Sequence, residues 1–154
     1  MTAVRATRTP PDHPTASADT RESDAPARAV GAVALAALAL IHVEDLPTTF
    51  TASRLVGGEY LALIATSIGI ATALLTRRAG PRLWLSAGAL AGSAMLAYVL
   101  SRTVGIPGDY GDIGNWRCTL GLAALTTEAM IIMLSGWCFV KSLAWARFRR
   151  RPGQ

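Results

Sequence analysis

Residues 118–140 read CTLGLAALTTEAMIIMLSGWCFV, a run of about two dozen residues in which Glu128 alone is charged. About 20 consecutive apolar residues form a helix long enough to cross the hydrocarbon core of a bilayer. The run therefore predicts a transmembrane helix. It also places an ionisable carboxyl near the middle of the membrane, where a charge is costly and needs a reason.

The composition of the chain agrees with a membrane protein. Of 154 residues, 51% are hydrophobic and 16% are charged, whereas soluble domains carry about 25% charged residues. We expect an all-α membrane protein, a bundle of four transmembrane helices at about residues 29–45, 57–75, 83–101 and 117–140. The short apolar start of the first stretch also resembles a secretory signal, but the long charge-balanced segment before it favours a retained span.

The two ends of the chain differ from this transmembrane domain, which we expect to cover residues 29–146. Residues 1–28 contain four prolines and balanced charges without apolar periodicity, so we expect a disordered cytoplasmic tail. Residues 147–154 are rich in arginine and form a short basic tail.

Basic residues predict the orientation in the membrane. Arg77, Arg78 and Arg82 lie between the second and third spans, and Lys141 and the C-terminal arginines follow the fourth. Cytoplasmic loops are enriched in Lys and Arg, so we expect both termini in the cytoplasm and the protein in the plasma membrane. Since topology accounts for most of the net charge of +5, we expect no nucleic-acid partner.

The face of the last span that carries Glu128 is rich in small residues, which suit helix packing better than contact with lipid. At helical spacing it includes Gly121, Ala124, Leu125, Ile132 and Ser135. We therefore expect the carboxyl to point into the bundle. It serves either as a protonated packing residue, since neutralisation is the usual response to a low dielectric, or as a binding group.

Four further polar residues flank the same ends of the first three spans. His42 and Asp45 are three positions apart and share one side of the first helix, which we expect Pro47 to end. Glu59 begins the second span and Arg102 follows the third. If these faces converge, the residues form a polar vestibule open to the outside, with Glu128 at its floor about 16 Å deep.

Each of these residues also has a simpler interpretation. His42 can be an interfacial imidazole bonded to backbone or water, and Glu59 and Arg102 an ordinary interfacial ion pair or two snorkelling side chains. The vestibule hypothesis makes His42, Glu59 and Glu128 the candidate ligands of a divalent metal, because imidazole and carboxylate suit such ions.

The segment between the third and fourth spans contains four glycines and Pro107. This composition specifies tight turns, and we expect the loop to fold over the outer mouth of the bundle. Asp112 or Asn115 can cap the start of the fourth span, which Trp116 immediately precedes. Asp109 and Asp112 can instead bind a hard cation, although their spacing matches no calcium loop.

Two patterns concern packing and anchoring. Gly88 and Gly92 form a GxxxG motif on the third span, which permits close helix approach within the bundle or in a homodimer. Four tryptophans lie near the ends of the predicted spans, where interfacial aromatic belts occur, and we expect them to anchor the bundle: Trp84, Trp116, Trp137 and Trp145.

A family resemblance appears at the outer loop. The string SRTVGIP, followed by GDIGNW and then by Gly121 and Glu128, resembles a group of uncharacterised four-span integral membrane proteins of actinobacteria. In that group a histidine late in the first span, here His42, and a carboxyl in the last, here Glu128, recur. The resemblance covers about residues 30–140 and implies the fold, but no substrate.

Three classes of function follow from these residues. The leading expectation is a non-enzymatic accessory or scaffold protein, whose outer loop or GxxxG face meets a membrane-protein partner. The alternative is a module that binds or transports a metal ion or protons through the polar site. No GxSxG, HExxH or phosphate-binding glycine loop is present, so we expect no enzyme, and we expect no cofactor beyond a possible divalent metal.

Overall fold

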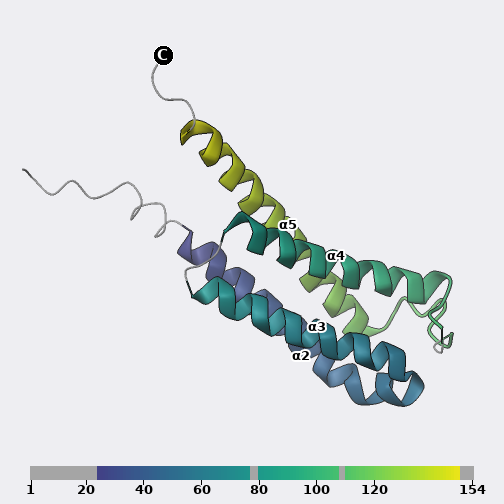
Figure 1. Ribbon diagram of the computed structural model, residues 1–154. Helices are drawn as coiled ribbons and strands as arrows, with labels where there is room; N and C mark the ends of the chain where they lie inside the picture. The colour runs from purple at the N-terminus through teal and green to yellow at the C-terminus, as the bar shows by residue number, and fades with distance from the viewer. Residues whose placement is uncertain (1–23, 77–79, 108–109, 150–154) are drawn as a thin grey trace, which may run out of the picture.

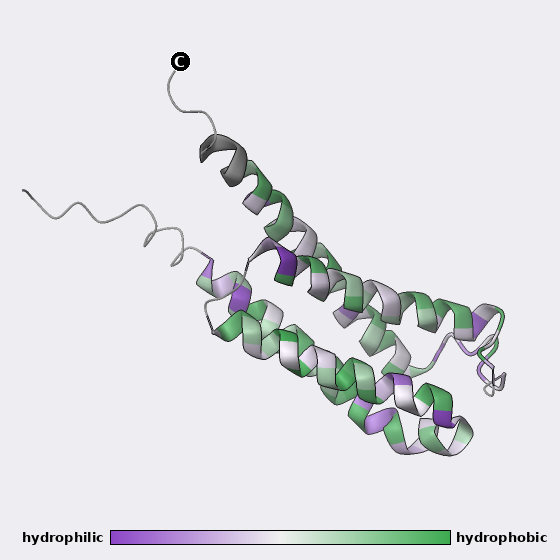
Figure 2. Cartoon of the chain, in the orientation of Figure 1, coloured by the Kyte–Doolittle hydropathy of each residue, from purple (hydrophilic) through white to green (hydrophobic). Residues whose placement is uncertain are grey.

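The computed structural model describes residues 24–76, 80–107 and 110–149, which contain four α-helices. They are α2 (Ala25–Ala52), α3 (Arg54–Leu75), α4 (Pro81–Thr103) and α5 (Thr119–Arg149). Each is long and apolar enough to cross a membrane, α5 over Thr119–Ala144. Hydrophobic residues run along all four helices, and strongly hydrophilic residues are few within them (Figure 2). The expected four-helix membrane bundle is confirmed.

The helices form two antiparallel hairpins, α2 with α3 and α4 with α5 (Figure 1). The hairpins pack on each other mainly through α2 and α5. The first and last helices also meet at one end of the bundle, where Lys141 Nζ lies 3.0 Å from Asp24 Oδ1. The opposite end, called the loop end below, carries the α2–α3 connection and residues 104–107 and 110–118 (Figure 1).

The expectation that Pro47 ends the first helix is wrong, because α2 continues through Pro47 to Ala52. A proline inside a helix removes one backbone hydrogen bond, and membrane helices tolerate that loss. The chain turns instead at Ser53, which is extended at φ −149° and ψ 118°. Its Oγ accepts a hydrogen bond from the N–H of Val56 at 3.5 Å and caps α3.

The boundaries of the tails also differ from those expected. Helix α2 begins at Ala25, so residues 25–28 belong to it, and Pro26 suits its first turn, where an N–H is not needed. The remainder of the expected disordered tail, residues 1–23, lies outside the described residues. Helix α5 runs on to Arg149, into the expected basic tail, and residues 150–154 are likewise outside.

The core of the bundle combines large apolar side chains with small residues that let helices approach closely. Leu38, Leu74 and Ile131 are buried. Trp84 is 6% exposed and packs on α2, where a Cβ added at Gly31 would lie 2.9 Å from its ring. Trp84 is therefore a core residue, contrary to the expected anchoring role. Trp116 and Trp137 are exposed, and the side chain of Trp145 is not described.

The two glycines of the GxxxG motif have different surroundings. A Cβ added at Gly88 would lie 3.2 Å from Cβ of Ser135, so Gly88 brings α4 close to α5. A Cβ added at Gly92 would meet no described atom within 4 Å. Only the first glycine therefore contributes to packing inside the described bundle.

Candidate functional site: a polar cavity at the loop end

One cavity of about 120 Å³ brings together side chains from all four helices. Its lining includes every polar residue that the sequence singled out on the spans, together with one residue from the loop: His42, Asp45, Glu59, Arg102, Asp112 and Glu128. Glu59 is also exposed, so the cavity reaches the surface of the bundle. The faces whose convergence the vestibule hypothesis assumed all contribute to this cavity.

Glu128 is the most deeply buried ionisable group of the cavity. Its side chain is 1% exposed, and its Oε2 atom has no hydrogen-bond partner among the described residues. The small residues Gly121 and Ala124 precede it on α5 and line the same cavity, so this face of α5 points inward as its composition indicates. A buried carboxyl oxygen without a partner is unusual and requires an explanation.

His42 is oriented by its own helix. Its Nδ1 lies 2.9 Å from the carbonyl oxygen of Leu38, one turn earlier, and the imidazole is 8% exposed. An Nδ1–H that donates to this carbonyl leaves Nε2 of the neutral ring as a hydrogen-bond acceptor. The edge of the ring also contacts Tyr60, with the ring centroids 4.8 Å apart.

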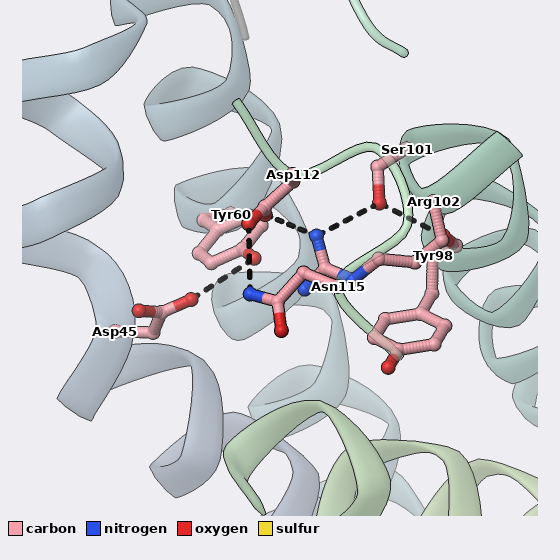
Figure 3. Close-up of polar contacts among 7 residues, drawn as sticks. All are labelled: Asp45, Tyr60, Tyr98, Ser101, Arg102, Asp112 and Asn115. Carbon is pink, nitrogen blue, oxygen red and sulfur yellow. Dashed lines mark hydrogen bonds and ion pairs between the residues drawn. The ribbon is translucent and has the colours of Figure 1, made fainter. Parts of the chain in front are cut away.

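Tyr60 connects the two sides of the α2–α3 hairpin, a role that the sequence analysis missed. Its hydroxyl donates to Oδ2 of Asp45 at 3.3 Å (Figure 3). The sequence feature that could have identified it is its position next to Glu59, nearly two turns after the start of α3. An aromatic residue at that depth is more often a membrane anchor, so the pattern alone does not identify a cavity residue.

Arg102 organises the mouth of the cavity. Its guanidinium forms an ion pair with Asp112, donates to Oγ of Ser101 at 3.5 Å and lies over the ring of Tyr98, 4.7 Å from the ring centroid (Figure 3). Arg102 is 7% exposed, although it belongs to the last turn of α4. The alternative in which Arg102 pairs with Glu59 is not what the structure shows, because Arg102 pairs with Asp112 of the loop.

The loop is attached to the end of α4 through backbone as well as side chains. The N–H of Gly114 donates to the carbonyl oxygen of Arg102 at 2.9 Å. Gly105 and Gly114 have φ of +82° and +81°, a region that favours glycine. Asn115 Nδ2 donates to Asp112 Oδ1 at 3.4 Å, and the ring of Trp116 packs edge-on against Tyr98 at 6.2 Å.

Three expectations for the loop have different outcomes. Helix α5 begins at Thr119, so neither Asp112 nor Asn115 caps it. Asp109, the partner proposed for Asp112 in cation binding, lies outside the described residues, and Asp112 is paired with Arg102. Pro107 is exposed in the loop.

The metal candidates share the cavity but do not form a metal centre. Within residues 24–76, 80–107 and 110–149, no three His, Cys, Asp or Glu side chains are placed to hold one metal ion. His42 and Glu128 are buried, whereas Glu59 is exposed.

Comparison with known proteins adds no closer identification. No protein-family model, curated protein or solved structure matches the chain. The class of protein, a four-helix membrane bundle with a polar cavity at one end, therefore follows from its own sequence and geometry.

Proposed function

We propose that the protein is a proton-binding membrane module in which Glu128 exchanges a proton with the outer side through the cavity. The observation that carries this proposal is the buried carboxyl oxygen of Glu128 that lines the cavity without a hydrogen-bond partner. Such a carboxyl is neutral when it holds a proton and costly when it is ionised. The affinity of Glu128 for a proton therefore depends strongly on whether water or a cation in the cavity can stabilise its ionised form.

His42 supports the same proposal. The contact of Nδ1 with the Leu38 carbonyl holds the ring and leaves Nε2 free to accept and return a proton. Because His42 and Glu128 line one cavity of about 120 Å³, water between them can complete a path. A cavity of this volume has room for several waters.

The proposed setting is the plasma membrane, with both termini in the cytoplasm and the loop end outside. Two groups of basic residues support this orientation: Arg77, Arg78 and Arg82 around the start of α4, and Lys141 with the C-terminal arginines in and after the last part of α5. Cytoplasmic segments are enriched in such residues. Proton exchange alone needs no bond to form or break in a substrate, so the proposal is non-enzymatic.

A non-enzymatic accessory or scaffold role is the second candidate. The outward face of α3 favours it, because a Cβ added at Gly58 or Gly69 meets no described atom within 4 Å and Ala62 between them is exposed. Small residues of this kind permit close approach of another helix. In this case Glu128→Gln leaves both folding and association with a partner unchanged.

Infrared spectroscopy tests the proton-binding proposal. The protein is reconstituted in lipid vesicles, and the carbonyl band of protonated carboxyl groups is followed across pH for the wild type, Glu128→Gln and Glu44→Gln. Glu44 is exposed on α2 and does not line the cavity, so it is a matched control. Exposed carboxyls also protonate in acid, so the band of interest is the one at the frequency of a carboxyl in apolar surroundings. We expect such a titrating band to be lost in Glu128→Gln and kept in Glu44→Gln. A band that persists in that variant, or no titrating buried band in the wild type, contradicts the proposal.

A further inference from the structure

We infer that the cavity binds a small protonated alkylamine, whose ammonium group replaces the proton on Glu128. This inference rests on the proposed proton exchange and specifies the ligand class of the same site. Three properties of the cavity carry it: its charge balance, its apolar wall and its size.

The charges of the cavity favour a cation. Four carboxyl groups line it, against the one guanidinium of Arg102, which is already paired with Asp112. Neither this ion pair nor that of Asp24 with Lys141 joins Asp45, Glu59 or Glu128 to a lysine or an arginine. Asp45 does accept a hydrogen bond from the hydroxyl of Tyr60. A cation that approaches Glu128 supplies the missing partner to a 1% exposed carboxyl.

Among the described residues, eight other groups that can change charge line the cavity together with Glu128. They are His42 and Asp45 on α2, Glu59 and Tyr60 on α3, Tyr98 and Arg102 on α4, and Asp112 and Cys118 in the loop.

The wall of the cavity selects an organic cation over a metal ion. Apolar side chains from all four helices line it, among them Ile41, Leu63, Ala97 and Leu120. A divalent metal needs several donors around it, and the part of the chain that the structure describes holds no such group of three. An alkylammonium instead needs one carboxylate and a few acceptors for its N–H groups, with an apolar surface for its hydrocarbon chain.

The volume limits the length of that chain. An engineered apolar cavity of about 150 Å³ in another protein holds benzene, and the cavity here is about 120 Å³. The ligand is therefore somewhat smaller than benzene, which corresponds to a primary amine of a few carbons such as n-propylamine.

The exchange is balanced in protons and charge. The amine enters as an ammonium ion, the carboxyl of Glu128 releases its proton to water, and an ammonium–carboxylate pair remains. One positive charge enters and one leaves, so the net charge of the site is unchanged. No covalent bond other than the O–H bond of Glu128 breaks, and no oxidant or reductant is needed.

Calorimetry combined with a pH indicator in weak buffer tests the inference on the full-length protein in lipid nanodiscs. The probe is n-propylammonium, and 1-propanol and sodium are the controls for its hydrocarbon part and its charge. We expect the wild type and Glu44→Gln to bind the amine with release of protons. Glu128→Gln should bind it about tenfold more weakly or worse, as expected for loss of a charged hydrogen-bond partner.

A second pair of variants keeps the test informative if Glu128→Gln does not fold. Ala124 lines the cavity one turn before Glu128, and its neighbour Ala123 is exposed. Ala124→Leu should fill the cavity and abolish amine binding, whereas Ala123→Leu should bind the amine like the wild type.

The outcomes separate the two proposals. If Glu128 titrates in the infrared experiment but n-propylammonium does not bind, the amine inference is wrong and the proton-binding proposal stands. If the amine binds equally to Glu128→Gln, or if 1-propanol binds as well as the amine, the inference is wrong because the carboxyl does not select the ligand. If Glu128 does not titrate and no proton is released, both proposals are wrong.

Discussion

Arg102 and Asp112 form an ion pair in which the guanidinium is 7% exposed and the carboxylate is 36% exposed. The pair joins the last turn of α4 to a loop that the backbone also holds through Gly114. Removing one partner of a buried pair costs about 3–5 kcal/mol, whereas an exposed pair contributes at most about 1 kcal/mol. We expect the stabilisation from this pair to lie between these two values, because water reaches Asp112 but hardly reaches Arg102.

We expect Asp112→Asn to lower the free energy of unfolding by about 1–3 kcal/mol, because it leaves the buried guanidinium without a counter-charge. The measurement is thermal or denaturant unfolding in detergent. A double-mutant cycle with Arg102→Gln isolates the pair, since the double variant should be less destabilised than the sum of the single ones. Additive effects would show that the two side chains do not stabilise each other.

Gly121 allows the ring of Tyr98 to lie directly against α5. A Cβ at this position would overlap that ring, which Arg102 and Trp116 hold from two other sides. We expect Gly121→Ala to lower the free energy of unfolding by about 1–3 kcal/mol. Gly136→Ala is the control on the same helix, because its Cβ would meet nothing described within 4 Å. Helix propensity should make the control neutral or slightly stabilising, and equal losses in both variants would argue against the contact.

Gly114 has φ of +81°, and its N–H holds the loop on Arg102. Since a Cβ is disfavoured by about 1–2 kcal/mol in the left-handed region, we expect Gly114→Ala to lower the melting temperature. It should also increase hydrogen exchange in the loop. Gly111→Ala is the control, because Gly111 lies in the same loop without positive φ or a close neighbour. No difference between the two variants would show that the loop does not depend on this backbone conformation.

The two glycines of the GxxxG motif should respond differently to a large side chain. We expect Gly88→Leu to separate α4 from α5 and to lower the melting temperature strongly, since Ser135 leaves no room for it. Gly92→Leu should leave the fold intact. Resonance energy transfer between labelled copies in liposomes then tests a homodimer: loss of transfer in Gly92→Leu alone would show that this glycine lies between two chains.

Labelling of single cysteines tests the proposed orientation. The native Cys118 and Cys138 are replaced by serine, and a cysteine is introduced at exposed Gly111 in the loop or at exposed Thr76 after α3. A membrane-impermeant maleimide added to intact cells should label residue 111 and not residue 76. Residue 76 should react only after permeabilisation, and the reverse pattern would place the cavity on the cytoplasmic side.

Much of the architecture follows from the sequence, because crossing a bilayer imposes length and hydropathy on each helix. The inward face of α5 was also predictable, since Gly121, Ala124 and Glu128 share one side at helical spacing. The prediction that Pro47 ends α2 was wrong because it used a rule for helices in water. There a proline usually ends or kinks a helix, whereas membrane helices tolerate one. The choice of Asp112 over Glu59 as the partner of Arg102 depends on the folded loop, and no local pattern encodes it.

The hairpin order has a consequence for how the protein is made. Glu128 lies on α5, which leaves the ribosome after α2, α3 and α4, while most groups that surround it belong to those three helices. Until α5 is in place, α2 lacks its contacts with α5, and the polar residues on the first three helices lack the helix that carries Glu128. The cavity is thus complete only once α5 has joined the other three helices, and a chain truncated before α5 would keep His42, Asp45, Glu59 and Arg102 without the carboxyl of Glu128.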